Sequence, residues 1–146
     1  MTAVQFDLTT APSAEDARAL SEGIVEFNRR SRPGLEEISA EVKCFVFVRD
    51  DAGAVIGGLR ASCYWNALHV ELVWLSDAAR GSGAGRELLA RAEAFAREKG
   101  CQLALVQTTD WQARPFYEKC GYTCFGTVAD LPRDGATHFL HKRLHG

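Results

Sequence analysis

The chain has 146 residues, of which 47% are hydrophobic and 25% charged, and its formal net charge is −2. This composition is typical of a folded globular domain and excludes intrinsic disorder, collagen-like repeats and coiled coils. The slight acidity argues against a dedicated nucleic-acid-binding protein, which needs a basic surface to neutralise phosphates. No apolar stretch is long enough to span a membrane, and Met1–Asp16 lacks the basic and apolar regions of a signal peptide.

The first part of the chain predicts one strand and one or two helices. Val4–Leu8 alternates apolar and polar residues, which is typical of a short strand. Ser13 and Asp16 resemble a capping box ahead of apolar residues at helical spacing, and Arg30–Gly34 ends that helix. Leu35–Val42 is a candidate for a second short helix.

Three strands are expected next. Cys44–Val48 is an apolar run of β-branched and aromatic residues, and Asp50–Gly53 turns the chain into a second strand that ends near Tyr64. Together they indicate a hairpin. Leu68–Leu75 predicts the third strand.

The second half alternates helices and strands. Ala84–Lys99 places its apolar residues on one helical face, and Leu103–Val106 indicates a buried strand. Gln112–Cys120 predicts a short helix, and Tyr122–Val128 pairs with His138–Leu140 in a final hairpin. Because strands occur both as hairpins and around a helical crossover, we expect one α/β domain with a mixed sheet and helices on both faces.

Five cysteines occur without any CxxC pair. Three of them lie in apolar, strand-like runs, where reduced and buried thiols are the ordinary finding. We therefore expect a cytoplasmic protein whose core needs no disulfide.

The most informative segment is a glycine-rich turn, Trp74–Arg86, between a strand and a helix. Its small residues leave backbone N–H groups uncovered and the helix N-terminus adds partial positive charge, which favours an anion such as a pyrophosphate. The segment fails the patterns of a P-loop, a dinucleotide fingerprint and a nucleophile elbow. What remains is Arg-x-x-Gly-x-Gly, with Arg80, Gly83 and Gly85. On its own this pattern also fits a helix start whose small residues allow close packing.

A second motif lies one strand later, where Phe116–Tyr122 has the sequence Phe-Tyr-Glu-Lys-Cys-Gly-Tyr. With both motifs in this order, separated by one helix and one strand, the chain resembles the GNAT superfamily of N-acetyltransferases. These enzymes transfer acetyl from acetyl-CoA to an amine. The resemblance covers nearly the whole chain. It implies a single GNAT-like domain over residues 1–146, with a mixed, mostly antiparallel central sheet, a splayed strand pair and helices on both faces.

The resemblance also implies which residues hold acetyl-CoA, with no metal. They are the end of a strand, the glycine-rich turn with its two arginines on the pyrophosphate, and an aromatic residue of the second motif: Val73, Trp74, Leu75, Arg80, Gly81, Ser82, Gly83, Ala84, Gly85, Arg86 and Phe116. Asp110 stands where many family members carry an Asn on the pantetheine arm. It keeps the hydrogen-bond acceptor and loses the NH₂ donor.

Two residues are expected to carry catalysis. By resemblance, Tyr117 protonates the departing thiolate, because a phenol with a pKa near ~10 is close in basicity to a thiol near ~8.5; a buried packing tyrosine is the alternative. Glu71 and His69 share a strand face that we expect to continue through Val73 and Leu75. Glu71 is the candidate general base, directly or through a water, with an ion-paired strand residue as the alternative and His69 in reserve.

The expected function is direct transfer of acetyl from acetyl-CoA to a primary amine of a small molecule. Aromatic and amide side chains are candidates for the acceptor pocket: Phe27, Asn28, Tyr64, Trp65, Asn66 and Trp111. A non-catalytic acyl-CoA-binding sensor and a protein lysine or N-terminal acetyltransferase remain open as alternatives. We expect a cytoplasmic homodimer without nucleic-acid or membrane partners.

Overall fold

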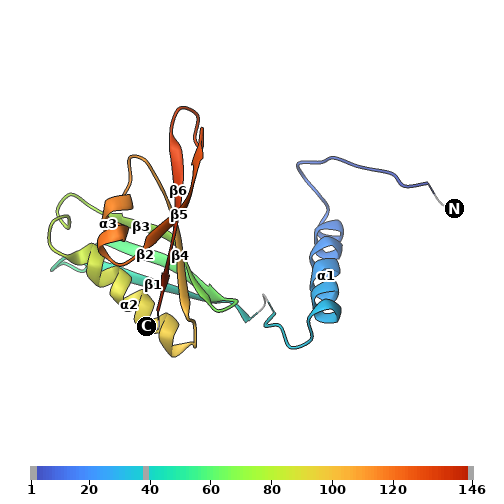
Figure 1. The fold of residues 1–146 in the computed structure, drawn as a ribbon, viewed down its shortest axis with the longest axis horizontal. Coiled ribbons are helices and arrows are strands. Elements are labelled where there is room, and N and C mark those ends of the chain that lie inside the picture. Colours follow the sequence, from blue (N-terminus) through green and yellow to red (C-terminus); the bar gives the residue numbers. More distant parts are fainter. Residues whose placement is uncertain (1–2, 38–39, 145–146) are drawn as a thin grey trace. The chain divides into compact units, whose positions relative to one another are not determined.

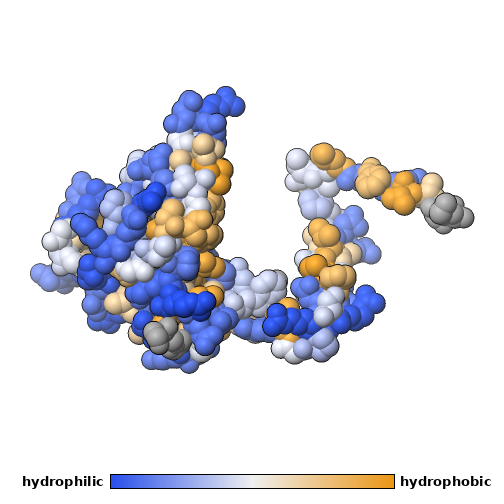
Figure 2. Space-filling view, in the orientation of Figure 1, coloured by the Kyte–Doolittle hydropathy of each residue, from blue (hydrophilic) through white to orange (hydrophobic). Residues whose placement is uncertain are grey.

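The computed structural model describes residues 3–37 and 40–144, and the chain divides into two compact units, Met1–Glu37 and Ile38–Gly146. The first unit contains helix α1 (Ala14–Ser31). Its predicted cap is confirmed, because the Ser13 hydroxyl accepts a hydrogen bond from the backbone N–H of Asp16 at 3.0 Å. Apolar side chains gather on this helix and on the segment that precedes it (Figure 2). That residues 1–146 form a single domain stays a prediction.

Two predictions for the N-terminal part are wrong. Val4–Leu8 forms no strand, since an alternating run becomes a strand only when a neighbour pairs with its backbone. Leu35–Val42 forms no α-helix in its described residues; residues 38 and 39 lie outside the described part, and Val42 already begins the first strand.

The second unit is built on one six-stranded sheet, in the order β1-β2-β3-β4-β6-β5 (Figure 1). Every neighbouring pair is antiparallel except β3 and β4, so the predicted mixed α/β fold is confirmed. The strands and helices are β1 (Val42–Arg49), β2 (Val55–Tyr64), β3 (Ala67–Leu75), α2 (Ala84–Glu98), β4 (Leu103–Thr109), α3 (Arg114–Lys119), β5 (Thr123–Ala129) and β6 (Ala136–Arg143).

The parallel pair β3–β4 separates partway along its length. Pairing runs from Ala67 opposite Leu103 to Val70 opposite Val106 and ends there, although β3 continues to Leu75. Beyond Val70, the edge of β3 that faces β4 carries backbone groups without a strand partner. The splayed strand pair expected from the sequence is therefore present.

A β-bulge at Glu71 reverses the alternation of β3. Arg60 of β2 pairs with Leu72 and Ala61 with Val70, so Glu71 has no opposite residue. One extra residue moves the side chains that follow to the other face of the sheet. The expectation that Glu71, Val73 and Leu75 share one face is therefore wrong.

Helix α2 covers one face of β1, β2 and β3, and its apolar stripe forms the centre of the core. Tyr117 of α3 and Tyr122 belong to the same buried cluster, so both helices of this unit contribute to one core. Within the described residues, no helix is long and apolar enough to cross a membrane. The members of this core on α2 are Leu88, Leu89, Ala92 and Ala96.

A buried ion pair fixes α2 to the end of the sheet. The Glu93 carboxylate is 4% exposed and accepts hydrogen bonds from the Tyr122 hydroxyl and from Lys142 Nζ, both at 2.8 Å. Burial and the neighbouring Glu93 carboxylate raise the pKa of Tyr122, so its hydroxyl stays a donor. The Lys142 ammonium also lies 5.6 Å from the centre of the Tyr122 ring. These contacts join α2, the start of β5 and β6.

Replacing Lys142 with Met removes the nearer cation of the buried Glu93 carboxylate and leaves only the Arg97 guanidinium, 4.0 Å away. We expect the free energy of unfolding to fall by about 3 kcal/mol, as for other broken buried ion pairs. The double variant Glu93→Leu/Lys142→Met removes both charges and should regain much of that loss. Equilibrium unfolding in urea measures both, and a cost below about 1 kcal/mol for the single variant would contradict this role.

Candidate active site

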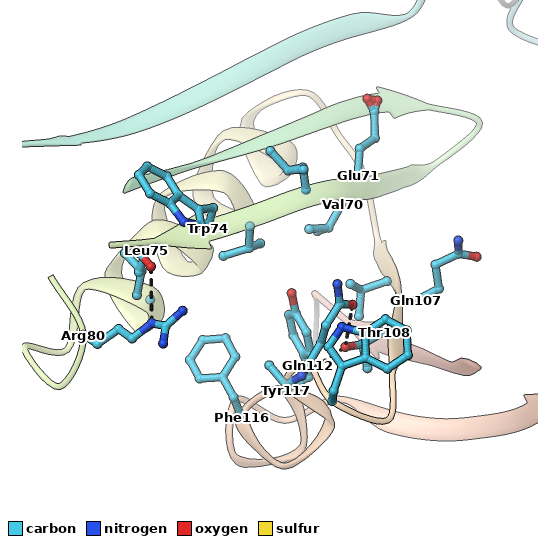
Figure 3. Close-up of a pocket in the computed structure, with 16 residues that line it drawn as sticks. Val70, Glu71, Trp74, Leu75, Arg80, Gln107, Thr108, Gln112, Phe116 and Tyr117 are labelled. Atoms are coloured by element: carbon cyan, nitrogen blue, oxygen red, sulfur yellow. Dashed lines mark hydrogen bonds between the residues drawn. The ribbon is translucent and has the colours of Figure 1, made fainter. Parts of the chain in front are cut away.

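The splay between β3 and β4 contains a cavity of about 590 Å³ (Figure 3). This volume lies within the usual range for small-molecule sites. Its walls come from β3, the glycine-rich turn, the start of α2, β4, and the loop that leads into α3. The lining residues are Val70, Glu71, Leu72, Val73, Trp74, Leu75, Arg80, Gly85, Val106, Gln107, Thr108, Trp111, Gln112, Ala113, Phe116 and Tyr117.

The cavity passes from one face of the sheet to the other. Glu71, Trp74 and Gln107 are directed to one side of the strands, whereas Phe116 and Tyr117 lie on the other (Figure 3). This division follows from the bulge and from the alternation of side chains along each strand. The two sides can therefore serve two different ligands, or two ends of one reaction.

The glycine-rich turn contains two glycines with left-handed backbone conformations. Gly81 and Gly83 have φ values of +76° and +81°, a conformation in which residues other than glycine are strained. Gly83 is also the N-cap of α2. The first N–H groups of α2 have no intrahelical partners and point out of its N-terminus. At Gly85 a Cβ atom would meet the Phe116 ring at 3.3 Å, so this glycine allows the close approach of α3 to α2.

Arg80 connects this turn to the cavity. Its Nε donates a hydrogen bond to the backbone oxygen of Leu75 at 3.3 Å, and its guanidinium lies 3.3 Å from the Asp77 carboxylate. Both members of that ion pair are exposed, so the pair contributes little to stability and leaves Arg80 available to a ligand. Arg86 is exposed on the first turn of α2.

Tyr117 is the most perturbed titratable group of the cavity. It is 5% exposed, and its ring packs edge-on against Phe116 and Tyr122. Burial, with a smaller contribution from Cys120, raises the pKa of Tyr117 to about 12. Its hydroxyl has no hydrogen-bond partner in the described part of the chain. The phenol is therefore a neutral proton donor at every physiological pH, directed at whatever occupies the cavity.

Glu71 is an exposed residue on the opposite side, with 31% of its side chain accessible to solvent. Its carboxylate forms an ion pair with Arg60 Nε at 3.4 Å. His69, the reserve candidate, stacks on the Tyr64 ring with 3.9 Å between ring centres and does not line the cavity. Of the two candidate bases, the structure brings only Glu71 to the cavity.

Half of the expected acetyl-CoA residues line the cavity and half do not. Asp110 is among those outside it, because its carboxylate is bound to His138 Nε2 at 2.8 Å. Of the acceptor-pocket candidates, Trp111 lines the cavity, Phe27 and Asn28 lie on α1, and the other three form the β2–β3 connection. The residues outside the lining are Gly81, Ser82, Gly83, Ala84, Arg86 and Asp110.

Sequence analysis missed Gln112 and Thr108. The predicted helix over Gln112–Cys120 begins two residues late, at Arg114, because residues 112 and 113 form a capped loop. In that loop the Thr108 hydroxyl accepts a hydrogen bond from the N–H of Ala113 at 3.1 Å. A Thr six residues ahead of a short helix gives no signal in the sequence, because the contact depends on how β4 ends.

Three comparisons identify relatives of the chain. A sequence model of the Acetyltransferase (GNAT) family matches residues 12–122. The chain is 40% identical over 116 residues to a blasticidin-S acetyltransferase of Streptomyces morookaense, covering 79% of this chain and 85% of that protein. It is 31% identical to an acetyltransferase of Agrobacterium fabrum, covering 97% and 100%. The crystal structure of an acetyltransferase from Bacillus cereus superposes with a TM-score of 0.82 at 28% identity, covering 94% and 97%.

We expect Tyr117 to stay un-ionised well above the ordinary tyrosine pKa of 10.0. Because the pKa is raised in the folded state, the stability from the neutral phenol is complete below pH 10 and is lost as the pH rises toward about 12. The difference in tyrosinate absorbance between the wild type and Tyr117→Phe isolates this group. Ionisation of Tyr117 at or below pH 10 in the folded protein would contradict its burial.

Proposed function

The chain belongs to the GNAT family of acetyltransferases, and from that membership we propose that it transfers acetyl from acetyl-CoA to a primary amine of a small molecule. It is an acyltransferase. The observation that carries the proposal is the cavity that opens both faces of the sheet between β3 and β4 and has a neutral phenol on one side and a carboxylate on the other.

The residues present fit acetyl-CoA, which supplies the activated acetyl group. The turn before α2 offers N–H groups and Arg80 to a pyrophosphate. Beyond Val70, the unpaired edge of β3 offers backbone N–H and C=O groups to a ligand. An extended arm that carries amides can form hydrogen bonds with this edge in the way that a neighbouring strand would. Trp74 and Leu75 lie at the end of this edge, next to the turn. A backbone N–H there also polarises a carbonyl that lies against the strand.

Tyr117 then acts on the leaving sulfur. Its O–H donates a hydrogen bond, and then its proton, to the sulfur as the bond to the acyl carbon breaks. Burial raises the pKa of a thiol as it raises that of a phenol, so the two groups remain comparable inside the cavity although the pKa of Tyr117 is about 12. The proton transfer needs no other acid.

Glu71 serves the attacking amine from the other side. An amine that reaches the site is largely protonated and must lose a proton before it attacks. The carboxylate and the phenol are on opposite sides of the splay, so the proton is taken from the nucleophile and given to the leaving group at separate points. We propose that Glu71 accepts this proton through a water and that the ion pair with Arg60 orients the carboxylate.

The acceptor class follows from the most similar named relative given above. Because a blasticidin-S acetyltransferase is 40% identical over 116 residues, blasticidin S is the first acceptor to test. Titration calorimetry with acetyl-CoA, and with ATP and NAD as controls, should show micromolar binding of acetyl-CoA alone. Release of free CoA thiol should then depend on blasticidin S.

The results separate the alternatives. Binding of acetyl-CoA without turnover of any amine or peptide would support a sensor. Turnover of peptides alone would support a protein acetyltransferase. Absence of acetyl-CoA binding would overturn the proposal.

Two matched variants test the assigned roles. Tyr117→Phe should lower kcat by about a hundredfold with little change in the KM for acetyl-CoA, because only the proton donor is lost. Glu71→Gln should remove or shift the decline of kcat/KM at low pH, because that decline reports protonation of the base.

The pH–rate profile of each variant, compared with that of the wild type, is the measurement. A Tyr117→Phe enzyme with unchanged kcat would show that the phenol only packs. A low-pH decline that survives Glu71→Gln unmoved would assign proton removal to another group.

A further inference from the structure

We propose that Gln112 orients the substrate: its side-chain amide donates a hydrogen bond to a carbonyl oxygen of the ligand on the Tyr117 side of the cavity. The inference rests on the proposed function. It assigns a role to a residue that carries no sequence motif. Gln112 belongs to the loop between β4 and α3, lines the cavity, and lies beside Tyr117 (Figure 3).

The network around Gln112 fixes which way its amide faces. The backbone N–H of Thr109 can only donate, and it lies 3.2 Å from Gln112 Oε1. The Thr108 hydroxyl accepts from the N–H of Ala113, which leaves its own proton for Gln112 Oε1 at 3.3 Å. Two donors therefore converge on Oε1. Oε1 is therefore held against Thr108 and Thr109, and the NH₂ group is available to a ligand.

The free NH₂ group selects the chemistry of its partner. In the described part of the chain, Gln112 Nε2 has no hydrogen-bond partner. With Oε1 already occupied, the side chain presents donors only. A protonated amine also presents donors only and gains nothing from this contact. An oxygen with free lone pairs, such as an amide or thioester carbonyl, is the group that matches it.

A second pair of side chains holds the loop that carries Gln112. His138 Nε2 lies 2.8 Å from Asp110 Oδ1 and donates to it, because a carboxylate oxygen accepts. The other ring nitrogen, Nδ1, lies 2.9 Å from Thr127 Oγ1 and 3.3 Å from Arg114 Nη1. The backbone N–H of Asp110 also donates to the oxygen of Ala136 at 3.2 Å. Asp110 and His138 are thus positioning residues that fix the loop to β6.

The variant Gln112→Glu removes the NH₂ donors and adds a negative charge, which the control variant shares. A glutamate keeps the oxygen that accepts from Thr109 and Thr108, so the loop stays capped, but it loses both N–H donors. Gln102→Glu is the matched control, since it makes the same change at a residue before β4 that does not line the cavity. Calorimetry with CoA, and steady-state kinetics with acetyl-CoA and the amine acceptor, are measured for the wild type and both variants.

Two results support the proposal and distinguish the source of the carbonyl. If it belongs to the CoA arm, Gln112→Glu weakens CoA binding by about fivefold, the usual effect of one lost neutral hydrogen bond, and Gln102→Glu does not. If it belongs to the acceptor, the KM for the acceptor rises by a similar factor and CoA binding is unchanged. If Gln112→Glu binds CoA as tightly as the wild type and both its KM values are unchanged, the proposal is overturned. If the wild type itself fails to bind CoA, the proposed function is overturned instead.

Variants at Asp110 test the positioning pair and give a second route to the same conclusion. Asp110→Ala removes the acceptor for His138 Nε2 and should reproduce the effect of Gln112→Glu on the same substrate. Asp110→Asn keeps an oxygen for that N–H and should restore the wild-type constants. If Asp110→Ala lowers only thermal stability and changes neither KM nor CoA affinity, the pair does not position Gln112.

Discussion

The site depends on the loss of backbone hydrogen bonds between β3 and β4 beyond Val70 and Val106. In a continuous sheet those N–H and C=O groups would satisfy one another, and no ligand could enter. Where the two strands separate, the groups need another partner, and the space between them becomes a cavity. The core that holds the strands apart is therefore as important for function as the residues that line the gap.

The bulge at Glu71 decides which later side chains of β3 line each side of the cavity. By adding one residue to β3, it places Trp74 on the side of Glu71, and Val73 and Leu75 on the face that carries Tyr117. A regular strand would have placed Glu71, Val73 and Leu75 together on one face. Alternation after Val70 places the Glu71 carboxylate on the side opposite the phenol, and this separation suits a reaction in which one group loses a proton while another gains one.

Between β4 and α3, the side chains that cap backbone N–H groups also line the cavity. Thr108 and Gln112 satisfy N–H groups at the end of β4 and the start of α3, and the same bonds orient the Gln112 amide. The Glu93 ion pair has the corresponding role on the other side of α3, where it fixes α2 to β6. The Glu93 network joins elements that are distant in the sequence, whereas the Thr108 and Gln112 contacts are local and depend on how the chain turns after β4.

The sequence alone determined the order of strands and helices from Val42 onward, the glycine-rich turn and the family, because these depend on periodicity, on glycines that tolerate positive φ, and on short motifs. It also proposed Tyr117 and Glu71 as site residues, and both line the cavity. Only the tertiary structure decided that Val4–Leu8 lacks a strand partner, that Asp110 binds His138, and that Gln112 faces the cavity. These features depend on contacts between separate strands and loops, and a one-residue bulge is enough to reverse a face that periodicity predicts.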